Sequence, residues 1–338
     1  MKKFLLLTLI AMVTVVSACS SNNAKDNGAS PSANTESPSN SEAAETGSSE
    51  PAGTEYSLEN DGVDQAALDE ALSQFPATVP TKIVTTSVPL TEMLHVLGIT
   101  PIGVPTSTNP IPADFDAVPR IGSPMQPDLE VVTKLEPELL LGAESLRSTL
   151  DKSLEGIAIE KAYLKTESFD DLKLSFKALG TYFKKTGEMN AVLTKILNKE
   201  NELAKQAEGK TLPSVMLMIG TAESFMVMSE RSYLGSLVKK LGADNIATSV
   251  LKVTDTYSPI NMESVVAADP DVILVLASGD HGASEDKFQK EVEKNDAWTK
   301  LTAYKNDKIR ILDYSTFGVT SINNVEKALG DIAKYFYE

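Results

Sequence analysis

A short pattern that occurs twice constrains the fold of this chain more than any other feature. It covers residues 129–141 and 262–274, and in each copy a Glu near the start is followed seven residues later by a Pro with an acidic residue on either side. An apolar run follows the Pro, as expected for a buried strand. Because Pro disfavours helical backbone in the residue before it, the pattern predicts a short helix, a tight turn and a buried parallel strand, once in each half of the chain.

Strands and helices alternate around each copy. The expected strands are residues 82–86, 102–104, 139–141 and 158–164 in the first half, and 214–219, 225–228, 272–276 and 309–312 in the second. The expected helices are residues 90–97, 233–241 and 325–335. Such alternation implies parallel sheets with helices on both faces. The predicted fold class is therefore α/β, with two Rossmann-like lobes that each contain a central parallel sheet.

The segment 168–209 lies between the two halves and has no strand pattern. Aromatic and aliphatic residues recur at helical spacing over residues 169–183, and a second helix without Pro is expected over about 188–207. We interpret the second helix as a long rigid connector between an N-terminal lobe, residues 78–167, and a C-terminal lobe, residues 210–338. The alternative is two ordinary surface helices within one larger domain.

The first residues have the features of an export signal. Two lysines precede an apolar run over residues 4–16, and small residues follow it. The run is too short to span a bilayer core of ~30 Å. The sequence Val-Ser-Ala-Cys that ends at Cys19 resembles a lipobox, so we expect residues 1–18 to be a signal peptide and Cys19 to carry a lipid. An ordinary signal followed by an accidental cysteine is the alternative. Cys19 is the only cysteine, which excludes internal disulfides and Cys-rich metal sites.

Residues 19–77 are expected to form a flexible polar tether. Ser, Asn, Ala, Glu, Gly and Pro dominate this stretch as far as about Glu59, and such a composition cannot bury enough apolar surface to fold. A tether after a lipobox is common in Gram-positive lipoproteins, so the expected location is the extracellular face of the cell membrane. The formal net charge of −16 argues against nucleic acid or an anionic lipid surface as a partner.

A lipobox, a polar tether, two α/β lobes and a helical connector together resemble the periplasmic-binding-protein superfamily. The connector is typical of the group that serves iron-siderophore, cobalamin, heme, zinc and manganese ABC importers, and the resemblance covers roughly residues 78–338. In that group one surface Glu on each lobe docks in an Arg pocket of the permease dimer. The resemblance assigns this role to Glu130 and Glu263 and implies a monomer. The alternative for each Glu is a favourable interaction with the start of its own helix.

Three residues bear on the ligand. Zinc and manganese sites need three or four protein donors, but the chain has only two histidines, His95 and His281. His95 lies in an amphipathic helix and is expected to be a surface or packing residue. His281 follows a buried strand, at the end of the sheet where open α/β folds bind ligands. Met125 lies between two prolines in a polar loop of the first lobe. The alternative for His281 is a solvated loop residue, and the alternative for Met125 is a side chain that packs against its own lobe.

One thioether and one imidazole, one on each lobe, form a pair that can ligate heme iron axially. Motifs at residues 104–107, 122–128, 232–238 and 281–282 resemble the heme-receptor lipoproteins of iron-regulated surface determinant systems. The resemblance implies that Met125 and His281 bind the iron of heme. It also implies capture of heme from an upstream cell-wall or secreted donor, for delivery to an ABC importer. Arg231 is a candidate propionate contact, with a solvated loop residue as the alternative.

The main rival prediction is a ferric-siderophore or cobalamin receptor of the same fold. It would need a cleft lined by Arg and aromatic side chains, and Phe225, Tyr257 and Phe317 are aromatic residues that could pack on a ligand or in the core. An enzyme is not expected, because the chain has no Gly-x-Ser-x-Gly elbow, no Gly-rich dinucleotide loop and no phosphate-binding loop.

Overall fold

The computed structural model describes residues 61–337 except 221–223 and 278–282. The predicted signal peptide, Cys19, His281 and most of the predicted tether therefore lie outside the described residues. Within the described ranges, no helix is long and apolar enough to cross a membrane.

The N-terminal lobe contains a small parallel sheet. Its strands are β1 (Ile83–Thr85), β2 (Leu139–Ala143) and β3 (Glu160–Leu164), hydrogen-bonded in the order β1-β2-β3. Its α-helices after β1 are α2 (Val88–Val96), α3 (Leu129–Leu135) and α4 (Arg147–Ser153). The expected strand at residues 102–104 is present only as isolated bridges, Val84 to Gly103 and Val104 to Arg120. Pro101 and Pro105 flank this segment and have no N–H to extend a ladder.

The C-terminal lobe contains a six-stranded mixed sheet. Its strands are β4 (Ser214–Gly220), β5 (Phe225–Met228), β6 (Asp244–Asn245), β7 (Tyr257–Pro259), β8 (Val272–Ala277) and β9 (Ile309–Leu312). The order is β7-β5-β4-β8-β9, with β6 also paired to β4. The central strands β4, β8 and β9 are parallel, as predicted, but β5 and β7 are antiparallel to their neighbours, which the sequence pattern did not predict. Only four residues separate β4 from β5, which is too few for a parallel crossover.

Helices cover both faces of this sheet, as predicted. They are α7 (Tyr233–Lys240), α8 (Ile246–Ser249), α9 (Met262–Ala268), α10 (Ala283–Lys294), α11 (Thr302–Lys305), α12 (Tyr314–Phe317) and α13 (Val325–Tyr337). Along β4, Val215 and Leu217 enter the core shared with α7 and α13, whereas Met216 and Met218 enter a separate core under α8 and α10. This alternation with a period of two residues is what a strand buried on both faces requires.

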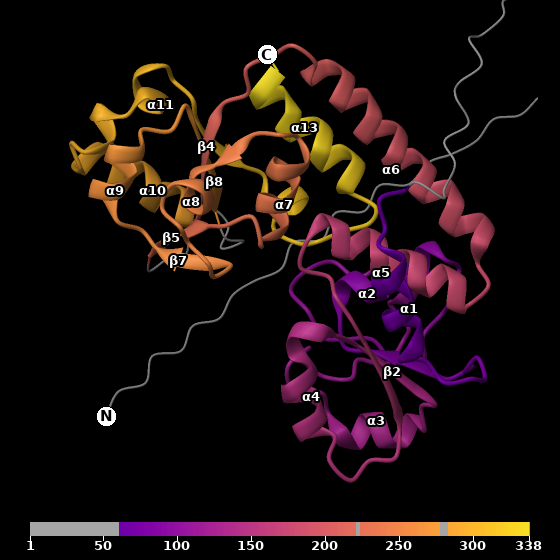
Figure 1. Cartoon of the computed structure of the whole chain (residues 1–338). Helices are drawn as coiled ribbons and strands as arrows, with labels where there is room; N and C mark the ends of the chain where they lie inside the picture. The colour runs from indigo at the N-terminus through magenta and orange to yellow at the C-terminus, as the bar shows by residue number, and fades with distance from the viewer. Residues whose placement is uncertain (1–60, 221–223, 278–282, 338) are drawn as a thin grey trace, which may run out of the picture. The chain divides into compact units, whose positions relative to one another are not determined.

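Two helices join the lobes, namely α5 (Phe169–Tyr182) and α6 (Thr186–Ala207). α5 begins at a capping box in which the Ser168 hydroxyl accepts from the Asp171 N–H and the Asp171 carboxylate accepts from the Ser168 N–H. α6 has 22 residues, which makes it about 33 Å long. It packs against both α5 and α13 (Figure 1). The predicted α/β fold with a long connector helix is therefore confirmed.

The duplicated sequence pattern folds in the same way in both lobes. α3 and α9 each have seven residues and end at an acidic residue in the left-handed conformation, Glu136 with φ 48° and Asp269 with φ 43°. After the Pro, Glu138 accepts hydrogen bonds from the Thr81 and Lys82 N–H groups, just before β1. Asp271 accepts from the N–H and hydroxyl of Ser214, the first residue of β4. In each lobe, the acidic residue after the Pro thus accepts hydrogen bonds that hold the start of the first strand in place.

The predicted tether ends earlier than residue 77. Residues Gln65–Ser73 form helix α1, which packs on α5. Leu68 and Phe75 are buried, and the Phe75 ring stacks on Tyr182 with 4.2 Å between centroids. Asp61 is buried and forms an ion pair with Lys177. The apolar residues of this segment follow helical spacing, so it buries a face although the stretch before it is polar.

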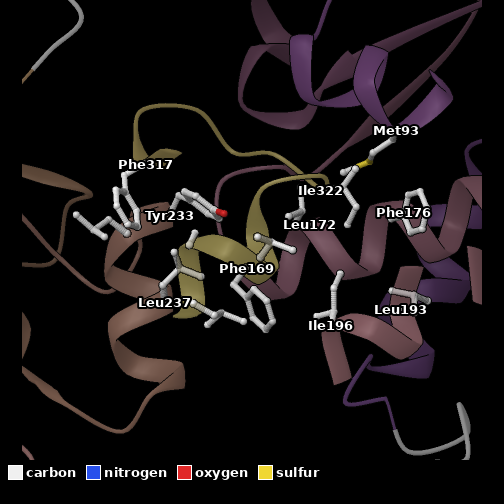
Figure 2. Packing of buried hydrophobic residues seen from close by; sticks show 14 of the residues in the cluster. Met93, Phe169, Leu172, Phe176, Leu193, Ile196, Tyr233, Leu237, Phe317 and Ile322 are labelled. Atoms are coloured by element: carbon white, nitrogen blue, oxygen red, sulfur yellow. The ribbon is translucent and has the colours of Figure 1, made fainter. Parts of the chain in front are cut away.

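One apolar core extends from the N-terminal lobe through the connector to the C-terminal lobe. Figure 2 shows Met93 of α2, Phe176 of α5, Ile196 of α6 and Leu237 of α7 within this cluster, together with Ile322 from the loop before α13. All five side chains are almost completely buried. The lobes cannot separate widely without exposing this surface, so we expect their relative movement to be small.

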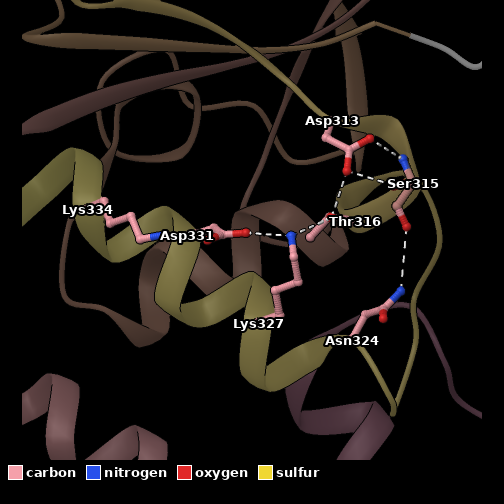
Figure 3. Close-up of polar contacts among 7 residues, drawn as sticks. All are labelled: Asp313, Ser315, Thr316, Asn324, Lys327, Asp331 and Lys334. Atoms are coloured by element: carbon pink, nitrogen blue, oxygen red, sulfur yellow. Dashed lines mark hydrogen bonds and ion pairs between the residues drawn. The ribbon is translucent and has the colours of Figure 1, made fainter.

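A polar network fixes the loop between α12 and α13 (Figure 3). Asp313 accepts hydrogen bonds from the backbone and hydroxyl of Ser315 and from the Thr316 hydroxyl, and the Ser315 bonds hold the pKa of Asp313 below its usual value. Lys327 of α13 donates to Thr316 and to Asp331. This loop continues through Ser321, which contacts the other lobe.

The contact is made by Glu92 of α2. Its Oε1 accepts hydrogen bonds from the Ser321 hydroxyl at 2.8 Å and from the Asn323 N–H at 2.7 Å. Burial raises the pKa of Glu92 above its usual value, although both hydrogen bonds oppose the rise. The Tyr233 hydroxyl near this carboxylate is buried without a hydrogen-bond partner among the described residues.

Replacing Glu92 by Gln should remove part of the pH dependence of stability. Because the pKa of Glu92 is higher in the folded chain than in the unfolded chain, the folded state binds the proton more readily. The free energy of unfolding therefore falls as the pH rises from the unfolded-state pKa of Glu92 to its folded-state pKa. The amide oxygen of Gln keeps both acceptor roles without the charge. We expect thermal unfolding of Glu92→Gln at about pH 8 to occur roughly 2–4 °C above that of the natural chain. Glu155→Gln, at an exposed position, is the control; a lower melting temperature for Glu92→Gln at both acidic and neutral pH would refute the prediction.

Candidate ligand site and docking residues

Met125 is presented to solvent by a loop of the N-terminal lobe. Its side chain has 57% of its surface exposed, more than any other large hydrophobic residue that the structure describes. Residues 103 and 104 extend the parallel sheet through isolated bridges, and Arg120 is bridged to Val104. The loop runs from Arg120 to the start of α3. The alternative in which Met125 packs back on its own lobe does not agree with this exposure. An exposed thioether held by ordered backbone is available to a ligand.

His281 lies outside the described residues, but the strand and helix on either side of it are described. β8 ends at Ala277 and α10 begins at Ala283. Ala277 pairs with Gly220 of β4, and Gly220 pairs with Phe225 of β5. The chain that contains His281 therefore starts from the carboxyl end of a central strand, where open α/β sheets bind ligands.

Arg231 lies in a different part of the C-terminal lobe. β5 runs antiparallel from Phe225, and the Met228 carbonyl accepts from Asn245, which pairs with Val215 near the start of β4. Arg231 follows Met228 by three residues. β5 therefore carries the chain away from the sheet edge at Ala277. The structure thus places Arg231 away from the sheet edge at Ala277, and the propionate contact stays a prediction.

Arg231 instead lines a polar cavity of about 1380 Å³ beside the connector. Glu200 of α6 and Lys240 of α7 line this cavity and form an ion pair at 2.5 Å, and Glu200 also pairs with the buried Lys173 of α5 at 3.0 Å. Lys173 and Glu200 are 2% and 8% exposed. One carboxylate thus pairs with two ammonium groups, and the network links the two connector helices to α7 of the C-terminal lobe.

Two of the three aromatic candidates, Phe225 and Phe317, pack within the protein. Phe317 is buried, and Phe225 makes an edge contact with Phe288 at 5.5 Å. Tyr257 is 45% exposed on β7. His95 forms a hydrogen bond with Asp114 at 2.7 Å and packs edge-on to Phe115, so it is a surface and packing residue as expected. Within the described ranges, no group of three or more His, Cys, Asp or Glu residues is arranged to hold a metal ion.

Glu130 and Glu263 occupy equivalent positions, each the second residue of its helix, α3 or α9. The helix ends are capped by the side chains of Asp128 and Asn261, two residues earlier, which accept from backbone N–H groups of the first turn. Both Glu side chains are exposed, and in the part of the chain that the structure describes neither has a hydrogen bond or an ion pair. Capping is thus done by Asp128 and Asn261, two residue types that are preferred at this position, and not by the Glu side chains.

The family model for periplasmic binding proteins matches residues 83–316. A heme uptake protein of Staphylococcus aureus, IsdE, is 33% identical over 265 residues, which cover 76% of this chain and 87% of that protein. The solved structure of S. aureus IsdE complexed with heme superposes with a TM-score of 0.67 and 30% identity, and covers 76% of this chain and 99% of that one.

The structure of S. aureus SirA complexed with staphyloferrin B is also similar, with a TM-score of 0.65. Its identity is 18%, over 77% of this chain and 94% of that one. At this level the likeness concerns the fold alone. Because proteins with this fold bind different ligands, the ligand has to be inferred from the residues at the sheet edges.

Proposed function

Because this chain belongs to the periplasmic binding protein family, whose members bind substrates for ABC transporters and are not enzymes, we propose that it is a lipid-anchored heme receptor. It would bind heme between its two lobes and deliver it to an ABC importer. The observation that carries the proposal is the exposed thioether of Met125, held at the edge of the N-terminal lobe. The similarity to a staphylococcal heme uptake protein supports the choice of ligand.

Heme needs few donors from the protein. The porphyrin supplies four nitrogens to the iron, so one thioether and one imidazole complete a six-coordinate centre. We assign these roles to Met125 and His281, one from each lobe. A bare metal ion would need three or four protein donors, whereas the chain has two histidines, and the described one, His95, is paired with Asp114.

The remaining parts of the proposal concern location and delivery. A lipid on Cys19 would hold the receptor at the outer face of the membrane, and the tether would let the lobes reach both an upstream heme donor and the permease. Glu130 and Glu263 would then each bind one permease subunit. Their exposed carboxylates lie at matching helix starts in the two lobes and have no partner among the described residues, which supports this role.

Titration of the purified protein with hemin tests the ligand. We expect one hemin per chain and a sharp Soret band of six-coordinate low-spin iron. A ferric siderophore added at the same concentration should neither compete with hemin nor quench the fluorescence of Trp298. Tight binding of the siderophore with no hemin spectrum would establish the rival receptor instead.

A further inference from the structure

Residues 121–128, which we call the Met125 hairpin, form a closed turn. The Asp128 N–H donates to the Ile121 carbonyl at 2.7 Å, and Gly122 and Pro127 form an antiparallel bridge. At the tip, the Gln126 N–H donates to both the carbonyl and the hydroxyl of Ser123, at 3.1 Å each. Met125 is the third residue of this four-residue turn. Its backbone position is therefore fixed although its side chain is exposed.

The Met125 hairpin is also attached firmly to its lobe. The Thr106 N–H donates to the Gly122 carbonyl at 2.7 Å, and the Ile121 N–H donates to the Val104 carbonyl at 2.9 Å. The Ile121 side chain is completely buried. At the other end, the Asp128 carboxylate accepts from the Glu130 and Val131 N–H groups and caps α3. The turn thus connects the sheet to a helix, and neither end can move independently.

Gly122 permits this closure. Its φ is +90°, and a Cβ at this position would lie 2.6 Å from the Asp128 nitrogen and 2.8 Å from the Gln126 oxygen. Both distances are shorter than real Cβ contacts, and both neighbours are backbone atoms that cannot rotate away. Any side chain at residue 122 would push the two strands of the hairpin apart, at the point where the Gly122–Pro127 bridge and the Asp128 hydrogen bond close it.

We infer that Gly122 is a positioning residue for Met125: by having no side chain, it closes the hairpin that fixes where the thioether meets the ligand. The final step, contact of the thioether with heme iron, rests on the proposed function. A metal–ligand bond depends on placement within a fraction of an ångström, so an open hairpin would weaken or remove the iron–sulfur bond.

The chain offers a matched control at Gly156, in the same lobe. It also has a positive φ, +82°, but a Cβ there would have no neighbour within 4 Å. Gly122→Ala and Gly156→Ala therefore impose the same kind of backbone strain, and only the first opens the hairpin. With hemin, we expect Gly156→Ala to give the natural low-spin spectrum. Gly122→Ala should lose the spectral signature of sulfur ligation and bind hemin at least tenfold more weakly.

A second readout needs no ligand. In the heme-free protein, the Asp128 amide proton should exchange with solvent at least tenfold faster in Gly122→Ala than in Gly156→Ala. A variant with one Gly inserted after Gln126 lengthens the turn without adding a side chain, and it should show the same two changes if Gly122→Ala does not fold.

Met125→Ala distinguishes a failure of the positioning role of Gly122 from a failure of Met125 as an iron ligand. If Met125→Ala alters the hemin spectrum but Gly122→Ala and the insertion do not, the positioning role is refuted while the proposed ligand remains. If Met125→Ala also leaves the spectrum unchanged, both the positioning role and the assignment of Met125 to the iron are refuted. A natural rate of Asp128 exchange in Gly122→Ala would show that the hairpin stays closed, and would overturn the inference.

Discussion

A chain with both Glu130 and Glu263 changed to Lys should bind hemin as the natural chain does, yet supply almost no heme iron to growing cells. Both residues are exposed second residues of equivalent seven-residue helices, and capping by Asp128 and Asn261 leaves their carboxylates unpaired in the described structure. Lys at either position would meet the positive pocket expected on the permease, and like charges at an interface cost several kcal/mol. We expect growth on heme as the iron source to fall at least tenfold.

The matched control is the pair Glu155→Lys and Glu326→Lys. Both residues are exposed, one in each lobe, and Glu326 is also the second residue of its helix, α13. This control changes the net charge by the same amount and should leave growth on heme near the natural level. Normal growth with the Glu130/Glu263 variant would eliminate the docking role, and equal loss in both variants would show a general effect of charge.

Replacing Glu200 by Leu should lower the free energy of unfolding by about 3–5 kcal/mol, because it leaves Lys173 buried without its partner. The second oxygen of Glu200 lies 2.5 Å from the Lys240 ammonium but lacks hydrogen-bond geometry, so an ion pair neutralises it. Urea unfolding measures the change. Since Lys173, Glu200 and Lys240 join the connector to α7, and one apolar core continues from there into the N-terminal lobe, the loss should appear as one cooperative shift.

Glu202→Leu is the control for Glu200→Leu. It lies two residues further along α6, is 51% exposed and pairs with Lys199, so its loss should cost less than about 1 kcal/mol. Adding Lys173→Met to Glu200→Leu should recover most of the lost stability, because no uncompensated charge then remains at that position. Similar effects of Glu200→Leu and Glu202→Leu would contradict the assigned role of the buried pair.

Local patterns predicted most of the fold. The duplicated signature predicted the short helices α3 and α9 and the starts of the strands that follow, because the Pro and the apolar run act over a few residues. α1 was missed, since its apolar positions are few within a polar stretch. The antiparallel direction of β5 was also missed, and that direction is what places Arg231 away from the sheet edge at Ala277.

The candidate site was predictable only in part. The prolines around Met125 indicated an unusual loop, and the structure shows that the side chain is exposed. The need for Gly122 depends on backbone atoms four and six residues later, which a sequence pattern does not place. The pair of Lys173 and Glu200 joins residues 27 positions apart on different helices, so only the packed fold brings them together.

The visible spectrum of the hemin complex, compared for the natural chain, Met125→Ala and His281→Ala, tests the heme-receptor proposal most directly. The proposal predicts a six-coordinate low-spin spectrum for the natural chain. Met125→Ala should lose the signature of sulfur ligation, and His281→Ala should lose that of imidazole ligation. If both variants bind hemin with the natural spectrum, or if the natural chain gives no low-spin spectrum, the proposed site is wrong.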